Sequence, residues 1–213
     1  MYMKIKKFEF NNFPVNTYVV YDETGEAALI DCGCIYPEEE AELSRFIEEN
    51  GLKPVRLLCT HLHLDHVLGN SYIREKYGLE PEAHSADVTG LPALEQQARL
   101  FGMLLKRPSV PVTRYLKEGE EVRFGNTSLS VIHVPGHSPG SVVFYNAPAN
   151  AAISGDVLFY GSIGRTDLWG GSQQELIEGI KSKLLVLPDE TVIYPGHGPE
   201  TTVGFEKRHN PFM

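Results

Sequence analysis

The stretch Thr60-His61-Leu62-His63-Leu64-Asp65-His66 decides how this sequence is interpreted. It directly follows the apolar run 55–59, which is typical of a strand. Side chains two apart in an extended chain share a face, so His61 and His63 can bind one ion together. A helix that begins at position 64 or 65 rotates the next two polar side chains toward a second ion. The spacing therefore predicts a site for two metal ions.

A solvated loop is the alternative for this stretch, and a lone histidine usually lies in one. Here three imidazoles lie close together and are flanked by apolar side chains. A partly buried cluster of this kind leaves ring nitrogens without hydrogen-bond partners unless it binds metal. We therefore expect further ligands downstream.

Three later strand ends each present one residue that can bind metal. His137 lies in a Pro-Gly turn, Asp156 follows a glycine, and His197 lies in a second Pro-Gly turn. Each turn follows an apolar run, and loops held by a rigid scaffold are where sites are built. Taken singly, each histidine can equally be a surface turn residue. Together with the stretch 60–66, the three turns point to one composite site.

The order of these motifs resembles the metallo-β-lactamase superfamily, in which H-x-H-x-D-H precedes a further His, Asp and His. The matching motifs are THLHLDH at 60–66, PGHSPGS at 135–141, SGD at 154–156 and PGHG at 195–198. The resemblance extends from Asp31 to His197. It implies an α/β fold, the four-layer αβ/βα sandwich. A chain of 213 residues leaves little room for a second domain, so we expect one domain over 1–213.

The same resemblance implies which residues bind metal. The first ion is assigned to His61, His63 and His137, the second to Asp65, His66 and His197, and Asp156 bridges both. The residues given a catalytic role are His61, His63, Asp65 and His66. Imidazole and carboxylate ligands suit two divalent ions, with zinc expected first and iron or manganese as alternatives. Two ions that share a hydroxide generate a nucleophile and polarise a carbonyl, so hydrolysis is the expected reaction.

Within the superfamily, the short chain and the segment 161–167 resemble the single-domain branch of glyoxalase II-type hydrolases. That resemblance implies a small thioester as substrate, S-lactoylglutathione or a related acyl-thiol. It also implies that Arg165 contacts a carboxylate of the substrate. An ion pair with Asp167 or Glu175 that shapes the loop is the alternative role for this arginine.

Asp31 is expected to support the metal site from outside. Its carboxylate can accept the free N–H of a ligand histidine and fix the tautomer, with a simple turn residue as the alternative. Three other histidines are left out of the site. His84 is expected in a solvated loop, His133 inside a strand and His209 near the terminus.

Other functions stay open beside the thioester hydrolase. Persulfide dioxygenases also carry a Gly-Arg-Thr-Asp segment and hold one iron, which here corresponds to His61, His137 and Asp156. Lactonases and nucleases are further metallo-hydrolases. A formal net charge of −9 without a basic tract argues against a nucleic-acid partner. A non-catalytic metal-binding module is the last alternative.

Composition limits the remaining classes. The N-terminal segment lacks an apolar signal region, and no stretch approaches the roughly eighteen apolar residues of a membrane span. We therefore expect a cytoplasmic protein with a small-molecule partner and no membrane partner, and the sequence does not indicate its oligomeric state. Cys32, Cys34 and Cys59 lack C-x-x-C spacing, so we expect no disulfide framework or zinc ribbon. Cys59 is expected to be a small buried hydrophobe.

Apolar periodicity and turn residues predict the elements. Strands are expected at 4–10, 17–21, 27–30, 122–124, 129–134, 142–145, 151–153 and 192–194, and helices at 37–50, 67–77 and 173–185. The segment 91–115 departs from this alternation, because a helix-like apolar stretch runs up to Pro108. Its apolar side either packs on the core or forms a flap or wall beside the metal site.

Overall fold

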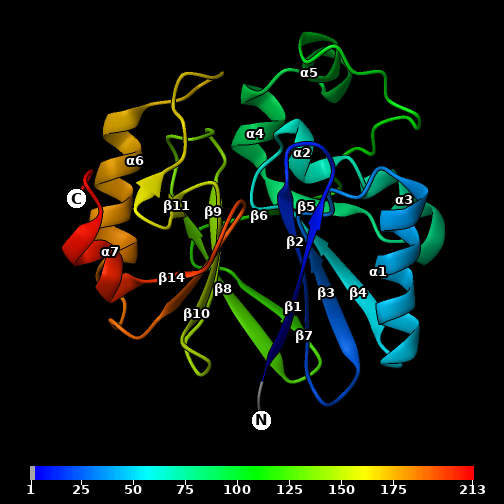
Figure 1. Cartoon of the computed structure of the whole chain (residues 1–213), viewed down its shortest axis with the longest axis horizontal. Helices are drawn as coiled ribbons and strands as arrows, with labels where there is room; N and C mark the ends of the chain where they lie inside the picture. Colours follow the sequence, from blue (N-terminus) through cyan, green and yellow to red (C-terminus); the bar gives the residue numbers. More distant parts are fainter. Residues whose placement is uncertain (1–2) are drawn as a thin grey trace.

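Two six-stranded sheets face each other in the computed structural model, which describes residues 3–213 (Figure 1). The first sheet runs in the order β1 (Lys4–Phe10), β2 (Val15–Tyr21), β3 (Glu26–Ile30), β4 (Lys53–Leu58), β5 (Pro81–His84) and β6 (Arg114–Leu116). The second runs in the order β14 (Thr201–Thr202), β13 (Val192–Pro195), β10 (Ala151–Gly155), β9 (Val142–Asn146), β8 (Thr127–His133) and β7 (Glu121–Phe124). A small hairpin consists of β11 (Leu158–Phe159) and β12 (Ser162–Ile163).

Strand β2 shows how the sequence produces the layers. Successive side chains of a strand point to opposite faces of the sheet. Tyr18 and Val20 pack in the core between the sheets, where they join Leu129 and Phe144 of the second sheet. Val19, between them in sequence, packs in the core on the outer face. Apolar side chains therefore cover both faces of this strand.

Helices cover the two outer faces. The first sheet is covered by α1 (Pro37–Glu49) and α3 (Asn70–Tyr77), and the second by α6 (Gln173–Gly179), the π-helix η1 (Ile180–Leu184) and α7 (Val203–His209). Figure 1 shows these helices on opposite sides of the paired sheets. Shorter helices lie near the upper ends of the strands: α2 (Leu64–Val67), α4 (Ser85–Gly90) and α5 (Leu94–Leu100). The predicted four-layer αβ/βα sandwich is confirmed.

The predicted helix over 67–77 is wrong in its first part. The chain forms α2 from Leu64, breaks at Leu68 and Gly69, and starts again as α3. At Gly69 the backbone N–H donates to the carbonyl of Cys32, and a Cβ there would lie 2.6 Å from the Cys34 sulfur. This close approach of two loops interrupts the helix, an effect that periodicity along the sequence does not reveal.

The segment 91–115 contains a shorter helix than its apolar stretch predicts. Helix α5 ends at Leu100, and Gly102 follows with φ +68°. Leu94 packs on the small core around Cys59, whereas Leu104 is 88% exposed. Phe101 lines a cavity beside the candidate site. Core packing and a wall beside the site thus belong to different residues of one segment.

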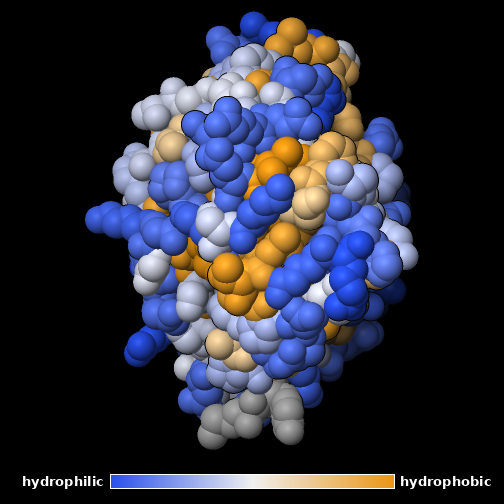
Figure 2. All heavy atoms as spheres, turned by 90° about the vertical axis from the view of Figure 1, so that its left-hand side faces the viewer, coloured by the Kyte–Doolittle hydropathy of each residue, from blue (hydrophilic) through white to orange (hydrophobic). Residues whose placement is uncertain are grey.

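Other elements test the remaining expectations. The predicted helix at 173–185 is divided into α6 and η1, and sequence patterns missed β5, β6, β11, β12, β14, α4 and α7 as separate elements. The three cysteines are buried and free, as expected. Among residues 3–213, no helix has the length and apolar character needed to cross a membrane. Figure 2 views the face that carries α6 and α7, where apolar residues reach the surface between polar ones.

Candidate metal centre

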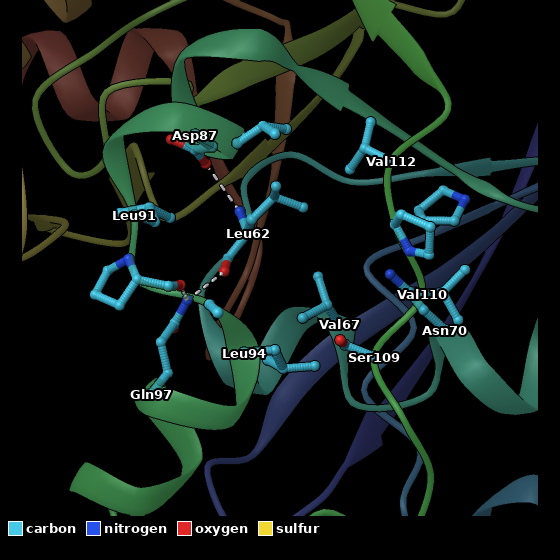
Figure 3. Close-up of a pocket in the computed structure, with 15 residues that line it drawn as sticks. Leu62, Val67, Asn70, Asp87, Leu91, Leu94, Gln97, Ser109, Val110 and Val112 are labelled. Carbon is cyan, nitrogen blue, oxygen red and sulfur yellow. Dashed lines mark hydrogen bonds between the residues drawn. The ribbon is translucent and has the colours of Figure 1, made fainter.

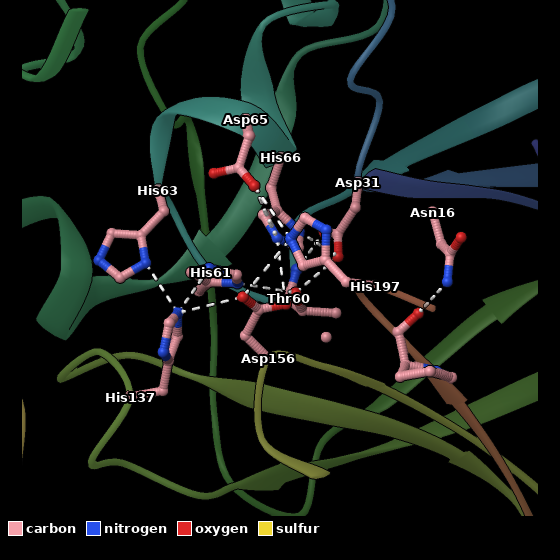
Figure 4. A network of polar contacts seen from close by, with 12 residues as sticks. Asn16, Asp31, Thr60, His61, His63, Asp65, His66, His137, Asp156 and His197 are labelled. Carbon is pink, nitrogen blue, oxygen red and sulfur yellow. Dashed lines mark hydrogen bonds and ion pairs between the residues drawn. The ribbon is translucent and has the colours of Figure 1, made fainter. Parts of the chain in front are cut away.

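The turns that follow four strands meet at one edge of the sandwich (Figure 4). His61, His63, Asp65 and His66 follow β4. His137 follows β8, Asp156 follows β10 and His197 follows β13. Strands β3 and β4 are parallel, as are β10 and β13, so their carboxyl ends lie at the same edge of each sheet. The sandwich places these two edges next to each other. It therefore brings together all seven residues that the sequence assigned to metal.

Three buried imidazoles form the first group. His61, His63 and His137 each offer one ring nitrogen, and these atoms lie within 4.8 Å of one another. The Nε2 atom of His137 lies 2.8 Å from Nδ1 of His63 and 3.1 Å from Nε2 of His61. Neutral imidazoles that converge so closely leave lone pairs pointing at one position. This is the donor arrangement of a transition-metal site.

Asp65, His66 and His197 form the second group, again with ligand atoms within 4.8 Å of one another. Nε2 of His197 lies 3.1 Å from Oδ2 of Asp65, and Nε2 of His66 lies 3.6 Å from the same oxygen. Helix α2 places Asp65 and His66 on the side of the loop away from His63, as the sequence predicted. This group contains mixed nitrogen and oxygen donors.

Asp156 lies between the two groups. Its Oδ2 atom is 3.6 Å from Nε2 of His137 and 3.6 Å from Nε2 of His197. Its Oδ1 atom is 3.3 Å from Nε2 of His66. One carboxylate thus faces ligand atoms of both groups, which is the geometry of a bridging ligand.

Hydrogen bonds on the far side of three rings, those of His61, His137 and His197, fix which nitrogen faces the site. Nδ1 of His137 donates to the carbonyl of Arg165 at 2.8 Å, and Nδ1 of His197 donates to the carbonyl of Pro14 at 3.0 Å. Nδ1 of His61 donates to the Thr60 hydroxyl at 3.1 Å. In each ring the proton therefore lies on Nδ1 and the lone pair on Nε2. Partners of this kind orient metal-binding histidines.

Asp31 has the supporting position that the sequence assigned to it. Its Oδ2 atom accepts from Nδ1 of His66 at 3.0 Å and from the Thr60 hydroxyl at 2.6 Å, while Oδ1 accepts from the Thr60 amide at 2.7 Å. The residue is fully buried and has φ +52°, a conformation that aspartate tolerates better than most residues. Because all these bonds use the carboxylate, Asp31 orients His66 directly and His61 through Thr60.

Unpaired buried atoms test whether the site fits a metal. Within residues 3–213, Nε2 of His66 and Oδ1 of Asp156 are buried without a hydrogen-bond partner. An imidazole lone pair and a carboxylate oxygen that face each other repel unless a proton or a metal ion lies between them. Each unsatisfied group costs about 1–3 kcal/mol, so this arrangement fits an ion. The donor set and the unpaired atoms agree.

The charges of the site follow the same division into two groups. Burial, aided by the imidazole of His137, lowers the pKa of His63 to about 3, and burial lowers the pKa of His61 as well. Burial opposes charge on His66 too, yet the carboxylates of Asp156 and Asp65 raise its pKa well above the ordinary value. His61 and His63 therefore offer neutral donors, and the second group attracts positive charge.

Gly196 leaves room for the carboxylate of Asp156, and Gly155 leaves room for the side chain of Thr60. A Cβ at Gly196 would lie 2.1 Å from Oδ1 of Asp156, and a Cβ at Gly155 would lie 2.2 Å from the Thr60 hydroxyl. Gly155 also has φ +48°, which L side chains rarely adopt. The Gly-Asp and Pro-Gly-His motifs thus have a steric reason in addition to their ligand residues.

The side chains of Asp87 and Gln97 hold residues 60–67, the metal-binding loop. The sequence motifs did not indicate either of the two residues. Asp87 accepts from the Leu62 amide at 2.8 Å and from the Ser138 hydroxyl at 3.0 Å, which joins the loop to the His137 turn. The Gln97 amide donates to the Leu62 carbonyl at 3.1 Å and accepts from the Leu64 amide at 3.0 Å. No motif marks these residues, because their partners are groups far away in sequence, most of them in the backbone.

His84 differs from the prediction of a solvated loop residue. It ends β5, is half-buried, and its ring stacks on His133 with centroids 4.0 Å apart. The side chain also accepts from the Ala86 amide and so caps α4. Neither histidine reaches the candidate centre.

A cavity of about 390 Å³ opens beside the two groups. Its polar lining includes His63, Asp65, His137, Asp156 and His197, and its apolar lining consists of Phe13, Leu64, Phe101, Phe159, Leu168 and Trp169. Arg165 lines it too, but the guanidinium makes two hydrogen bonds to Asp167, at 2.7 and 2.8 Å. The predicted substrate contact of Arg165 stays a prediction, and the alternative ion pair is present.

A second cavity of about 260 Å³ lies behind the metal-binding loop (Figure 3). Leu62 and Val67 of the loop and Leu94 of α5 face it, together with Val110 and Val112. Gln97 lines both cavities. The metal-binding loop therefore lies between two cavities, and hydrogen bonds from the side chains of Asp87 and Gln97 hold it there.

A family model described as metallo-beta-lactamase superfamily matches residues 11–197, a range that contains every residue of the two groups. The chain belongs to the metallo-β-lactamase superfamily. A curated member, hydroxyacylglutathione hydrolase GloC of Haemophilus influenzae, is 38% identical over 99% of this chain and 98% of its own length. The match over residues 11–197 and the similarity to GloC agree with a metal-binding hydrolase.

Solved structures of the superfamily show the same fold. BLEG-1, named a B3 metallo-β-lactamase, superposes with a TM-score of 0.86 at 36% identity, covering 98% of this chain and 99% of that one. TTHA1623, solved in a di-iron-bound form, superposes with a TM-score of 0.85 at 38% identity, covering 98% and 100%. Different members are thus similar to this chain to nearly the same degree, so similarity alone does not select a substrate or a metal.

Proposed function

We propose that this metallo-β-lactamase superfamily member is a two-metal hydrolase that cleaves small thioesters, as glyoxalase II does. The observation that carries the proposal is Asp156, whose Oδ2 atom lies 3.6 Å from a ligand nitrogen of each histidine group. A carboxylate shared in this way supports a dinuclear centre. His61, His63 and His137 would hold one ion, and Asp65, His66 and His197 the other. Zinc is the first candidate, with iron and manganese as alternatives.

Two divalent ions held by these residues would lower the pKa of water toward neutrality and would polarise a carbonyl. In the proposed reaction, water adds to the thioester carbonyl, the C–S bond breaks, and the products are a carboxylic acid and a thiol. Asp31 and the backbone carbonyls of Arg165 and Pro14 keep the ligand imidazoles protonated at the nitrogen away from the site. The cavity beside Asp65 receives the substrate.

The thioester is favoured over other acyl groups by the 38% identity with GloC, whose name describes hydroxyacylglutathione hydrolysis. The likeness to BLEG-1 makes a β-lactam the substrate to compare. The proposed small-molecule substrate also agrees with the cavity size, since small-ligand pockets span about 300–1,000 Å³.

The test is metal analysis combined with a substrate panel. Protein reconstituted with zinc, iron or manganese should bind up to two ions per chain and hydrolyse S-lactoylglutathione or a simpler lactoyl thioester faster than a β-lactam. Asp65→Ala should remove one ion and most of kcat while the fold persists. A protein that binds one iron and consumes oxygen with glutathione persulfide is a dioxygenase, and that result would overturn the proposal. Faster turnover of the β-lactam would also contradict it.

A further inference from the structure

Two phenylalanines from distant segments form an apolar wall of the active-site cavity. Phe13 lies in the turn between β1 and β2, and Phe101 directly follows α5. Their ring centroids are 5.6 Å apart in an edge-on arrangement, and both side chains line the cavity. Phe101 is 44% exposed, a large apolar surface for a residue at a cavity mouth. This surface is available to a ligand rather than used by the core.

Another part of the cavity wall is apolar as well. Phe159, Leu168 and Trp169 line it, and all three are half-buried. Phe159 also packs edge-on against the His197 ring at a centroid distance of 6.3 Å. A substrate whose carbonyl lies at the metal centre would therefore meet aromatic and aliphatic side chains in the rest of the cavity. Such surfaces gain free energy by burying apolar groups.

The charges of the cavity disfavour an anionic substrate arm. Among the described residues that line it, Arg165 is the only lysine or arginine, and its guanidinium is already paired with Asp167. Asp65 and Asp156 belong to the metal groups, so ions bound there would neutralise their charge, and neither carboxylate is a cationic partner for a substrate. A carboxylate placed against this apolar wall would lose hydration without gaining a free cationic partner.

We propose that the cavity selects thioesters whose thiol part is apolar and uncharged, and that Phe101 determines this specificity. The inference rests on the proposed thioester hydrolysis and names the substrate class of that site. The predicted order is thus an aryl or alkyl thioester ahead of S-lactoylglutathione. Segment 91–115 contributes to this choice through the one aromatic side chain that it places in the cavity.

The kinetic test compares two substrates with the same acyl group, the lactoyl thioester of benzyl mercaptan and S-lactoylglutathione. The benzyl thioester should have a kcat/KM at least about tenfold higher. Phe101→Ala should lower kcat/KM about tenfold for the benzyl thioester, mainly through KM, because it removes about 1.4 kcal/mol of apolar contact. The same change should leave S-lactoylglutathione nearly unaffected. Leu104→Ala, on the same segment but 88% exposed and outside the cavity, is the matched control.

A binding test separates this inference from the proposed reaction. Trp169 is the only tryptophan of the chain and lines the cavity, so its fluorescence reports occupancy. Benzyl methyl sulfide and S-methylglutathione, which cannot be hydrolysed, are titrated into the metal-loaded protein. The sulfide should bind at least tenfold more tightly, and both Phe101→Ala and Phe13→Leu should weaken it.

The outcomes distinguish the proposed thioester hydrolysis from the proposed preference of the cavity for an apolar thiol part. A preference for the sulfide without any thioester hydrolysis would overturn the proposed function and support the cavity assignment. Hydrolysis with a higher kcat/KM for S-lactoylglutathione would support the function and overturn the assignment. If Phe101→Ala lowered kcat/KM equally for both substrates, Phe101 would have a structural role, and this result would also overturn the cavity assignment.

Discussion

At the scale of single residues, the carboxylate of Asp31 supports ligand histidines of both groups. Asp31 accepts from His66 and, through Thr60, fixes the ring of His61. An amide in its place keeps the shape but replaces one acceptor oxygen with a donor. His66 would then have to accept at Nδ1, which moves its proton to Nε2, the nitrogen that faces the site.

Asp31→Asn should therefore weaken metal binding by about tenfold to a hundredfold, the usual range when a partner of a ligand histidine is changed. Competition with a chelator of known affinity measures this loss. Asp22→Asn is the control, because Asp22 is another buried carboxylate with hydroxyl and amide donors, in a different part of the fold. The explanation is wrong if both variants lose metal equally.

Arg165 gives a second prediction at this scale. Its guanidinium is paired with Asp167, and both side chains are exposed, so we expect the ion pair to be weak and to shape the loop. Arg165→Ala should change kcat/KM for charged and uncharged thioesters by similar small factors. Asp167→Ala frees the guanidinium and should raise kcat/KM for S-lactoylglutathione about fivefold, since a charge-assisted contact adds roughly 1 kcal/mol. A loss confined to the charged substrate in Arg165→Ala would instead establish a substrate clamp.

At the scale of elements, α5 is attached to the metal-binding loop by one buried side chain. The Gln97 amide bonds to Leu62 and Leu64 on the loop and to the carbonyl of Pro92. All three partners are backbone atoms, whose positions do not depend on a side-chain rotamer. Removing the amide leaves a buried N–H and a buried C=O unsatisfied.

Gln97→Ala should lower the free energy of unfolding by about 2–4 kcal/mol, or open the loop locally, because each orphaned group costs about 1–3 kcal/mol. Chemical denaturation and amide hydrogen exchange at Leu62 and Leu64 distinguish these two results. Gln96→Ala changes the neighbouring exposed glutamine and should leave both measurements unchanged. Unaltered exchange and stability in Gln97→Ala would show that α5 does not hold the loop.

At the scale of the whole molecule, the candidate centre joins the two halves of the sandwich. His61, His63, Asp65 and His66 follow a strand of the first sheet, whereas His137, Asp156 and His197 follow strands of the second. An ion bound by residues from both sheets stabilises their packing, since it binds only the folded arrangement.

Removal of metal by a chelator should therefore lower Tm. Occupancy at a hundred times Kd contributes about 2.7 kcal/mol per site, which corresponds to roughly 5–10 °C for a chain of this size. Thermal unfolding with and without chelator measures the shift, and adding zinc back should reverse it. Asp65→Ala should show a smaller shift than the unmodified chain, because one of the two groups loses a ligand. A chelator-independent Tm would contradict a structural contribution of the ions.

The sequence by itself predicted the strands and the candidate metal residues, and its resemblance to a known superfamily implied the four layers. Alternating apolar strands predict buried sheets, and the spacing of three histidines around Asp65 predicts two groups of ligands, because period and spacing are local properties of the chain. The later turns at His137, Asp156 and His197 could be recognised for the same reason. Each carries a ligand-type residue beside a glycine or proline.

Only the tertiary structure decided what surrounds these residues. Asp87 and Gln97 bond to backbone groups far away in sequence, and Phe13 packs against Phe101 in the cavity wall. Helix α5 stops at Leu100, before its apolar pattern ends. Such contacts depend on the distance between segments after folding, which no local pattern encodes. The candidate ligand residues could therefore be named from the sequence, whereas the shape and charge of the cavity could not be predicted.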